Sequence, residues 1–277
     1  MRKTGLWLCG ILLLLAACDD GGERKARAYL RQAEEAFAAG AFSEAKMQID
    51  SIRVLYPKAF EARREGIALM QRVELEEQRV SLLFLDSLLR ARQADFEAVK
   101  GKFAFEKDTA YQEVGNYFHP SQTVEKNVGR TFLRAQVDEH GQMLLSSIYR
   151  GSHPIHHHAV RVSADDGSFA ETPRTDDVYE TSYLGVLQEQ ADYKLGEDGD
   201  VIGFISLHEG DRIKAEFLGK RKYVVYLPEA DREAISEVYS LAQLLSAIDG
   251  IKKQMAEARL KMEFITRKMA EKEATGG

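Results

Sequence analysis

The chain contains almost no cysteine, with only Cys9 and Cys18 among its 277 residues. No cysteine follows Cys18. The chain beyond that point therefore cannot form a disulfide, a thiolate nucleophile or a sulfur-ligated metal centre. Its stability must come from buried apolar surface, and about 260 residues are enough to build one or two cores.

Long hydrophobic runs are also missing. The N-terminal run extends from Leu6 to Ala17 and stops at the acidic pair Asp19-Asp20. A membrane-spanning helix needs about 20 apolar residues, so this run is too short for an uncleaved transmembrane segment. Arg2 and Lys3 precede it, which is the arrangement of a secretory signal peptide.

Positive charge is in deficit, because 38 Lys and Arg residues stand against 44 Asp and Glu residues, for a net charge of −6. Nucleic acids are bound by neutralising phosphates with Lys and Arg, so this balance argues against a nucleic-acid partner. It argues equally against docking onto anionic lipid through a basic patch.

Motifs that carry chemistry are absent as well. The sequence contains no Gly-x-Ser-x-Gly elbow, Walker loop, Gly-x-Gly-x-x-Gly turn or His-Glu-x-x-His helix. Carboxylates are too numerous for any pair to indicate a glycosidase, which needs two at a defined separation. We therefore expect a protein that is not an enzyme.

The most informative motif in the sequence is Leu15-Ala16-Ala17-Cys18, at the end of the apolar run. This stretch resembles the lipobox of bacterial lipoproteins. The resemblance implies cleavage of a 1–17 signal peptide, lipidation of Cys18 and attachment to a membrane through that lipid. Without residues 1–17, 36 basic and 44 acidic residues remain, a net charge of −8.

Residues 18–23 are expected to form a lipidated, flexible tether, because glycine and charge resist packing. Asp19 directly after the cysteine resembles the inner-membrane retention signal of enterobacterial lipoproteins. The acidic cluster Asp19-Asp20-Gly21-Gly22-Glu23 instead resembles the surface-export signal of Bacteroides lipoproteins. We expect a cell-envelope location, with the outer membrane or the cell surface favoured.

The segment 24–60 has the pattern of two helices joined by a tight turn. Small residues stand where the helices would cross, at Ala33 and Ala45, while Gly40 marks the turn and Pro57 the end. This order resembles one tetratricopeptide repeat. The pattern does not return after residue 60, and a lone repeat must bury its face against another helix or a partner.

Two long helices are predicted, at 61–103 and 229–272, followed by a disordered tail at 273–277. The second carries a heptad seam with 4-3 spacing, formed by Leu244, Ile248, Ile251, Met255, Ala258, Met262, Ile265 and Met269. The apolar stripes predict an antiparallel coiled coil within one chain, with pairing between two copies as the alternative.

Between these helices, residues 104–228 alternate in polarity and carry a turn every eight to twelve positions, which predicts antiparallel strands. The strands are expected at 131–137, 143–149, 157–162, 168–171, 201–207, 213–218 and 223–226. The chain is therefore predicted to be α+β, with an inserted all-antiparallel, sandwich-like β domain between the coiled-coil helices.

His153, His156 and His158 form the strongest candidate metal site. Alternation in a strand would place His156 and His158 on one face, where neutral imidazoles could chelate zinc. The alternative is an exposed loop that Pro154 keeps extended. No cofactor other than the lipid on Cys18 is otherwise expected.

Tyr179, Tyr183 and Tyr193 lie near several carboxylates in a segment expected to be rich in loops. Aromatic faces beside carboxylates can hold sugars, although ordinary strands and turns have the same composition.

Taken together, these features predict a lipid-anchored envelope lipoprotein that acts as a non-catalytic scaffold for another envelope protein. A surface glycan- or peptidoglycan-binding lipoprotein is the alternative, and a metal-dependent hydrolase that uses the histidine cluster is the third.

Overall fold

The computed structural model describes residues 20–108, 110, 112–183 and 185–275. The chain divides into two compact units. The helical unit comprises the residues up to Asp86 and those from Gln254 onward, and the β unit comprises Ser87–Lys253. Helices and antiparallel sheets both occur, so the predicted α+β class is confirmed.

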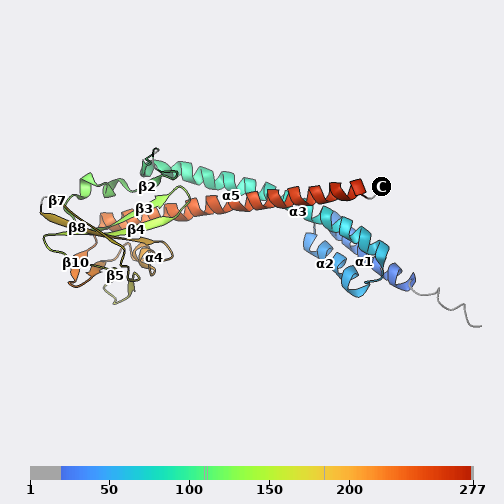
Figure 1. Cartoon of the computed structure of the whole chain (residues 1–277), viewed down its shortest axis with the longest axis horizontal. Coiled ribbons are helices and arrows are strands. Elements are labelled where there is room, and N and C mark those ends of the chain that lie inside the picture. The colour runs from blue at the N-terminus through green and yellow to red at the C-terminus, as the bar shows by residue number, and fades with distance from the viewer. Residues whose placement is uncertain (1–19, 109, 111, 184, 276–277) are drawn as a thin grey trace, which may run out of the picture. The chain divides into compact units, whose positions relative to one another are not determined.

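The helical unit begins with α1 (Asp20–Ala38) and α2 (Phe42–Leu55), which the third helix, α3 (Phe60–Val99), follows (Figure 1). Gly40 adopts a φ of +74° between α1 and α2, a conformation that glycine reaches without steric cost. One buried cluster joins the three helices, formed by Ala26, Leu30, Ala33, Ala36, Ala45, Ile49, Ile52, Ala59, Ala62, Leu69 and Val73.

The flexible tether predicted at 18–23 and the disordered tail predicted at 273–277 are both helical where the structure describes them. Residues 20–23 belong to α1, and the Glu23 carboxylate accepts a hydrogen bond of 2.8 Å from the Ala62 amide at the start of α3. This bond caps α3 and holds the beginning of α1 in place. At the other end, α5 (Glu229–Thr275) remains helical past residue 272.

The β unit contains two antiparallel sheets. The larger has the order β1-β2-β3-β4-β8-β7 and the smaller has the order β10-β9-β5-β6. The strands are β1 (Ala104–Glu106), β2 (Asn116–Phe118), β3 (Phe132–Asp138), β4 (Met143–Gly151), β5 (Ala159–Ser163), β6 (Phe169–Glu171), β7 (Val178–Tyr183), β8 (Val186–Lys194), β9 (Lys214–Leu218) and β10 (Tyr223–Tyr226). Three short 3₁₀ turns lie at Lys100–Lys102, Pro120–Gln122 and Glu125–Asn127.

Both sheets share one core. It combines Leu133 and Leu145 of the larger sheet with Val160 and Phe217 of the smaller sheet, all fully buried. The early turns of α5, including Ile235, join the same core and run among the strands in Figure 1. The core of the β unit is thus built from both sheets together with the start of α5.

The predicted strand at 201–207 is wrong, because these residues form the helix α4 (Val201–Leu207). Its buried residues are Val201, Ile202, Phe204 and Ile205, a spacing that places them on one helical face. The Asp198 carboxylate accepts a hydrogen bond of 2.7 Å from the Ile202 amide and so caps the first turn.

Most heptad positions of α5 are buried. Ile248, Ile251, Met255, Ala258 and Ile265 are each 4–6 % exposed. The residues between them, such as Lys252 and Glu263, are exposed. The burial therefore follows the predicted seam.

Candidate functional site

The histidine segment does not continue β5 as predicted. β5 begins only at Ala159, and His156 adopts a φ of +50°, which is unusual for a residue with a side chain. His156, His157 and His158 thus lie in no strand, so strand alternation does not set the direction of their side chains as expected.

Glu189 of β8 holds this segment in place from the interior. One carboxylate oxygen accepts hydrogen bonds from the amides of Ile155 (2.8 Å) and His156 (2.9 Å). The other accepts from the His157 amide (2.9 Å) and lies 3.0 Å from His157 Nδ1. Burial alone would raise the pKa of Glu189, but these four donors lower it overall. The carboxylate thus fixes a loop that has an unfavourable backbone conformation.

His157 extends the network to Ser147 of β4. Its Nε2 lies 2.9 Å from the Ser147 hydroxyl, and burial lowers the pKa of the imidazole. A neutral His157 donates from Nδ1 to Glu189 and accepts the hydroxyl hydrogen at Nε2. The Ser147 hydroxyl also lies 3.2 Å from the Ala191 carbonyl.

Serine, histidine and carboxylate follow one another here as in a hydrolase triad. The side chains of His157 and Glu189 are fully buried, and Ser147 is fully buried as well. A nucleophile must meet its substrate within hydrogen-bond reach, and this serine is closed off from solvent. The arrangement fits a structural role, in which it ties β4, β8 and the loop before β5 together.

A metal ion does not fit the neighbouring group of donors. Among the described residues, His156, Glu180 and Glu189 form the one cluster whose ligand atoms lie within 4.8 Å of one another. The two lone pairs of each Glu189 oxygen are already used by the four N–H groups. A zinc ion would have to displace bonds that hold the loop.

The other two predicted ligands lie apart from that cluster. His153 Nδ1 is 2.9 Å from the Ser152 hydroxyl, and the buried Nδ1 of His158 has no partner among the described residues. The structure therefore does not assemble His153, His156 and His158 into one ligand set.

Tyr179 and Tyr193 do not share one surface. Tyr179 and Tyr183 belong to β7 and Tyr193 to β8, so the segment forms an edge hairpin where loops were expected. Tyr179 is 65 % exposed, whereas Tyr193 is 5 % exposed and lies next to Thr172 and Ser147. Burial raises the pKa of the Tyr193 phenol. Tyr193 has no open face for a sugar, and glycan binding at the hairpin stays a prediction.

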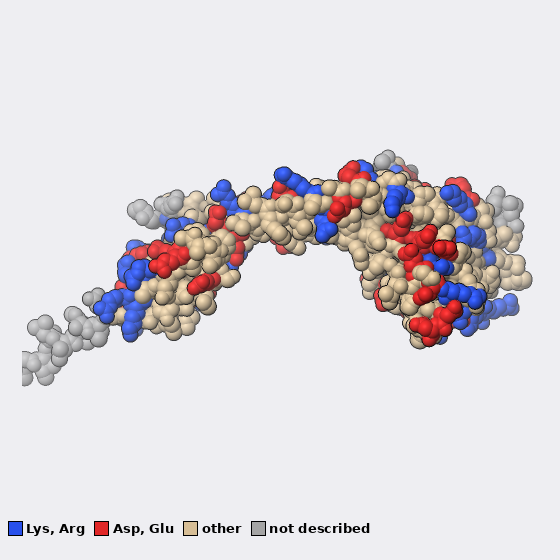
Figure 2. Space-filling view, turned by 180° about the vertical axis from the view of Figure 1, so that it is seen from behind, with Lys and Arg blue, Asp and Glu red and all other residues tan. Residues whose placement is uncertain are grey.

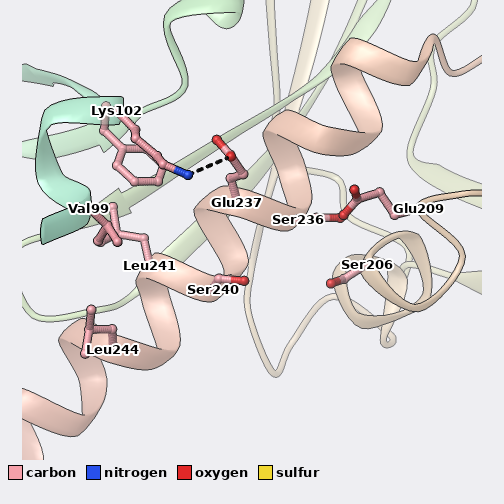
Figure 3. Close-up of a pocket in the computed structure, with 10 residues that line it drawn as sticks. Val99, Lys102, Ser206, Glu209, Ser236, Glu237, Ser240, Leu241 and Leu244 are labelled. Carbon is pink, nitrogen blue, oxygen red and sulfur yellow. Dashed lines mark ion pairs between the residues drawn. The ribbon is translucent and has the colours of Figure 1, made fainter. Parts of the chain in front are cut away.

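A hollow of about 350 Å³ lies against α5 within the β unit (Figure 3). Its lining combines apolar, hydroxyl and charged side chains, namely Val99, Lys102, Phe103, Ser206, Glu209, Ser236, Glu237, Ser240, Leu241 and Leu244. Figure 3 shows the hydroxyls of Ser206 and Ser240 turned toward each other across it. Sequence patterns could not indicate this hollow, because its residues come from three separate segments.

Charges inside the hollow are partly paired. Glu237 lies 3.6 Å from the Lys102 ammonium and 3.5 Å from His119 Nε2. No histidine occurs among the ten lining residues, so none of the serines has an imidazole base in the lining. The hollow offers hydrogen-bonding groups to a small polar molecule.

Cys18, the predicted lipidation site, and the 1–17 signal peptide lie outside the described residues. None of the described helices is both long and apolar enough to cross a bilayer. Comparison with protein-family models, with curated proteins and with solved structures found no match to this chain.

Proposed function

We propose that this chain is a lipid-anchored protein of the bacterial cell envelope that binds another protein and catalyses no reaction. The observation that carries the proposal is the apolar surface of the helical unit. Large side chains there are 46–70 % exposed, namely Met47, Val54, Leu55, Phe60, Ile67, Val80, Leu83, Phe84, Leu260 and Phe264. Many large apolar side chains exposed on one unit are typical of interaction sites.

The exposed residues follow helical spacing. Met47 and Val54 lie seven residues apart on α2, as do Phe60 and Ile67 on α3. Such spacing places each pair on one helix face. A helix of the partner, with its own apolar stripe, is the ligand that these faces suit.

The finer architecture belongs to the same proposal. α1 and α2 would act as one tetratricopeptide-like repeat, since Ala33 and Ala45 are fully buried at the crossing. α3 and α5 would form an antiparallel coiled coil within one chain, supported by the burial of the α5 seam. Cysteines at Leu82 and Met255 should then be joined by a short bifunctional maleimide within one chain, and joining of two copies would contradict the pairing.

The partner-binding proposal is tested by changing Phe84, one of the exposed apolar side chains of α3. Envelope proteins are crosslinked in intact cells that express the chain, and the products are separated by mass. Phe84→Glu should abolish a specific crosslinked product, because it places a charge on an apolar contact surface. Gln93→Glu, at another exposed position nine residues further along α3, is the matched control and should retain the product.

Two results would contradict the proposal. One is a product that both variants retain, since Phe84 would then play no part in binding. The other is the absence of any specific product from the unchanged chain.

A further inference from the structure

The smaller sheet ends in an edge strand with unusual composition. β10 pairs only with β9 and has the sequence Tyr-Val-Val-Tyr. Tyr223, Val224 and Tyr226 are 40–51 % exposed. An edge strand presents unpaired N–H and C=O groups to any extended chain that approaches it.

The register identifies the free backbone groups. Leu227 N–H donates to the Ile213 carbonyl at 2.9 Å, and these two residues continue the β9–β10 register. In an antiparallel pair the residues that bond to the neighbour alternate, so Val225 and Tyr223 also face β9. The N–H and C=O groups of Val224 and Tyr226 therefore point away from the sheet.

The outer face of β10 carries an aromatic ring held by a cation. The Arg212 guanidinium lies 4.0 Å from the centroid of the Tyr226 ring, and Tyr223 packs against Tyr149 at 5.1 Å between ring centroids. Both tyrosines are thereby held in position at the edge. Fixed side chains cost less conformational entropy when a ligand binds.

Positive charge surrounds this edge in a chain that is acidic overall. Lys220, Arg221 and Lys222 form the turn that leads into β10. Glu216, opposite Val224 on β9, is already paired with Lys222 at 2.8 Å and Lys214 at 3.5 Å. Within the described part of the chain, Lys220 and Arg221 have no acidic partner. Figure 2 shows both basic and acidic side chains on the face of the β unit that it draws.

We infer that β10 is a docking edge for an extended, acidic peptide segment of a partner protein, which adds a strand beside Val224 and Tyr226. Main-chain hydrogen bonds would supply affinity, and the basic turn would select acidic side chains. This surface is separate from the apolar stripe of the helical unit and does not depend on lipidation.

The test uses the full chain in detergent with two synthetic probes. One peptide alternates glutamate and valine over eight residues, and the other replaces every glutamate with lysine. Binding is followed by fluorescence anisotropy, and amide hydrogen exchange reports where the peptide lies. We expect the acidic peptide to bind at least tenfold more tightly than the basic one and to slow exchange at Val224 and Tyr226.

Two variants separate the backbone contribution from the charge contribution. Val224→Pro removes an outward N–H, a change that edge strands tolerate, and should weaken binding at least tenfold. Lys220→Glu with Arg221→Glu alters only an exposed turn. This double variant should also weaken binding of the acidic peptide at least tenfold. Lys194→Glu with Lys252→Glu, an equal charge change at exposed positions of the same unit, should leave binding within twofold.

The inference is overturned if both peptides bind equally, if protection appears away from β10, or if neither β10 variant weakens binding. Protection of β10 that grows with protein concentration in the absence of peptide would also overturn it, because a second copy would then be the occupant. The crosslinking experiment with Phe84→Glu tests the proposed function separately. Its outcome neither supports nor overturns the inference about β10.

Discussion

At the scale of single residues, Glu189 is a buried carboxylate held by several hydrogen bonds. Four N–H donors surround one carboxylate that has no contact with solvent. A buried charge is tolerated only when it is fully hydrogen-bonded, and here the donors come from the very loop that carries the positive φ of His156. The carboxylate and the loop conformation therefore stabilise each other.

Glu189→Gln tests this interdependence. The amide NH₂ of glutamine would face donors instead of accepting from them, so the free energy of unfolding should fall by about 3 kcal/mol or more. Urea unfolding followed by circular dichroism measures the loss. Glu180→Gln, half exposed beside His156, is the control and should cost under about 0.5 kcal/mol.

The lowered pKa of His157 gives a defined dependence of stability on pH. In the unfolded chain the imidazole titrates near its ordinary pKa of 6.5, whereas in the fold its pKa is lower. Between the two pKa values the unfolded state binds more protons, so stability falls as pH drops below 6.5. Glu189, whose pKa is lowered from 4.5, adds a second loss as pH falls below that value.

His157→Asn keeps an N–H donor for Glu189 but cannot titrate. The decline in unfolding free energy between pH 7 and pH 5.5, measured by urea unfolding at each pH, should therefore be smaller in this variant. His153→Gln, at an exposed position, should retain the full decline. An equally steep decline in His157→Asn would show that another group causes it.

At the scale of elements, the turn between β3 and β4 packs closely against α5. Gly141 has a φ of +87°, and a Cβ there would collide with the backbone of Ser246 and lie 2.7 Å from the Ala242 carbonyl. The turn therefore approaches the helix as closely as its backbone allows. The Ser246 hydroxyl, 3.1 Å from the Gly141 carbonyl, adds a hydrogen bond across this contact.

Gly141→Ala should lower the unfolding free energy by more than about 2 kcal/mol, since it combines left-handed strain with overpacking against α5. Gly167 separates the two contributions, because it has a φ of +88° but open space within 4 Å of where a methyl carbon would lie. Gly167→Ala should cost only about 1 kcal/mol, from backbone strain alone. Equal losses in thermal unfolding of the two variants would contradict the close packing.

Regular polarity patterns explain which elements could be predicted. β3, β4, β9 and β10 were expected within one or two residues, because polarity alternates along them and turns containing glycine separate them. The strand predicted at 201–207 failed because a short apolar run has no decisive period, and the Asp198 cap that favours α4 lies outside the run. The edge strand β7 was missed because its residues are mostly polar.

The candidate site could not be predicted in the same way. Ser147 and His157 are ten residues apart, and His157 and Glu189 are 32 apart. They meet because the β4–β8 register places Ser147 opposite Ala191 and Tyr149 opposite Glu189. Register is a property of paired strands, and no local pattern in this chain encodes it.

At the scale of the whole molecule, the proposed membrane attachment depends on lipidation of one cysteine. Cys18→Ala should move the protein from the detergent phase to the aqueous phase in a phase-separation assay, because each buried methylene of the acyl chains contributes about 0.8 kcal/mol. Cys9→Ala, inside the predicted signal peptide, should leave the partition unchanged. A purified chain whose mass shows no lipid would contradict the predicted anchor.

The division of the chain has a consequence for its synthesis. The helical unit contains residues from both sides of the β unit, since the residues from Gln254 onward belong with the segment up to Asp86. Roughly 170 residues are made in between, which takes about 10–30 s at ordinary translation rates. During that interval α1, α2 and the start of α3 can bury their shared cluster, but the residues from Gln254 onward that belong to the same unit are still missing. A chaperone that shields nascent chains would therefore matter more for this protein than for one whose units are completed in chain order.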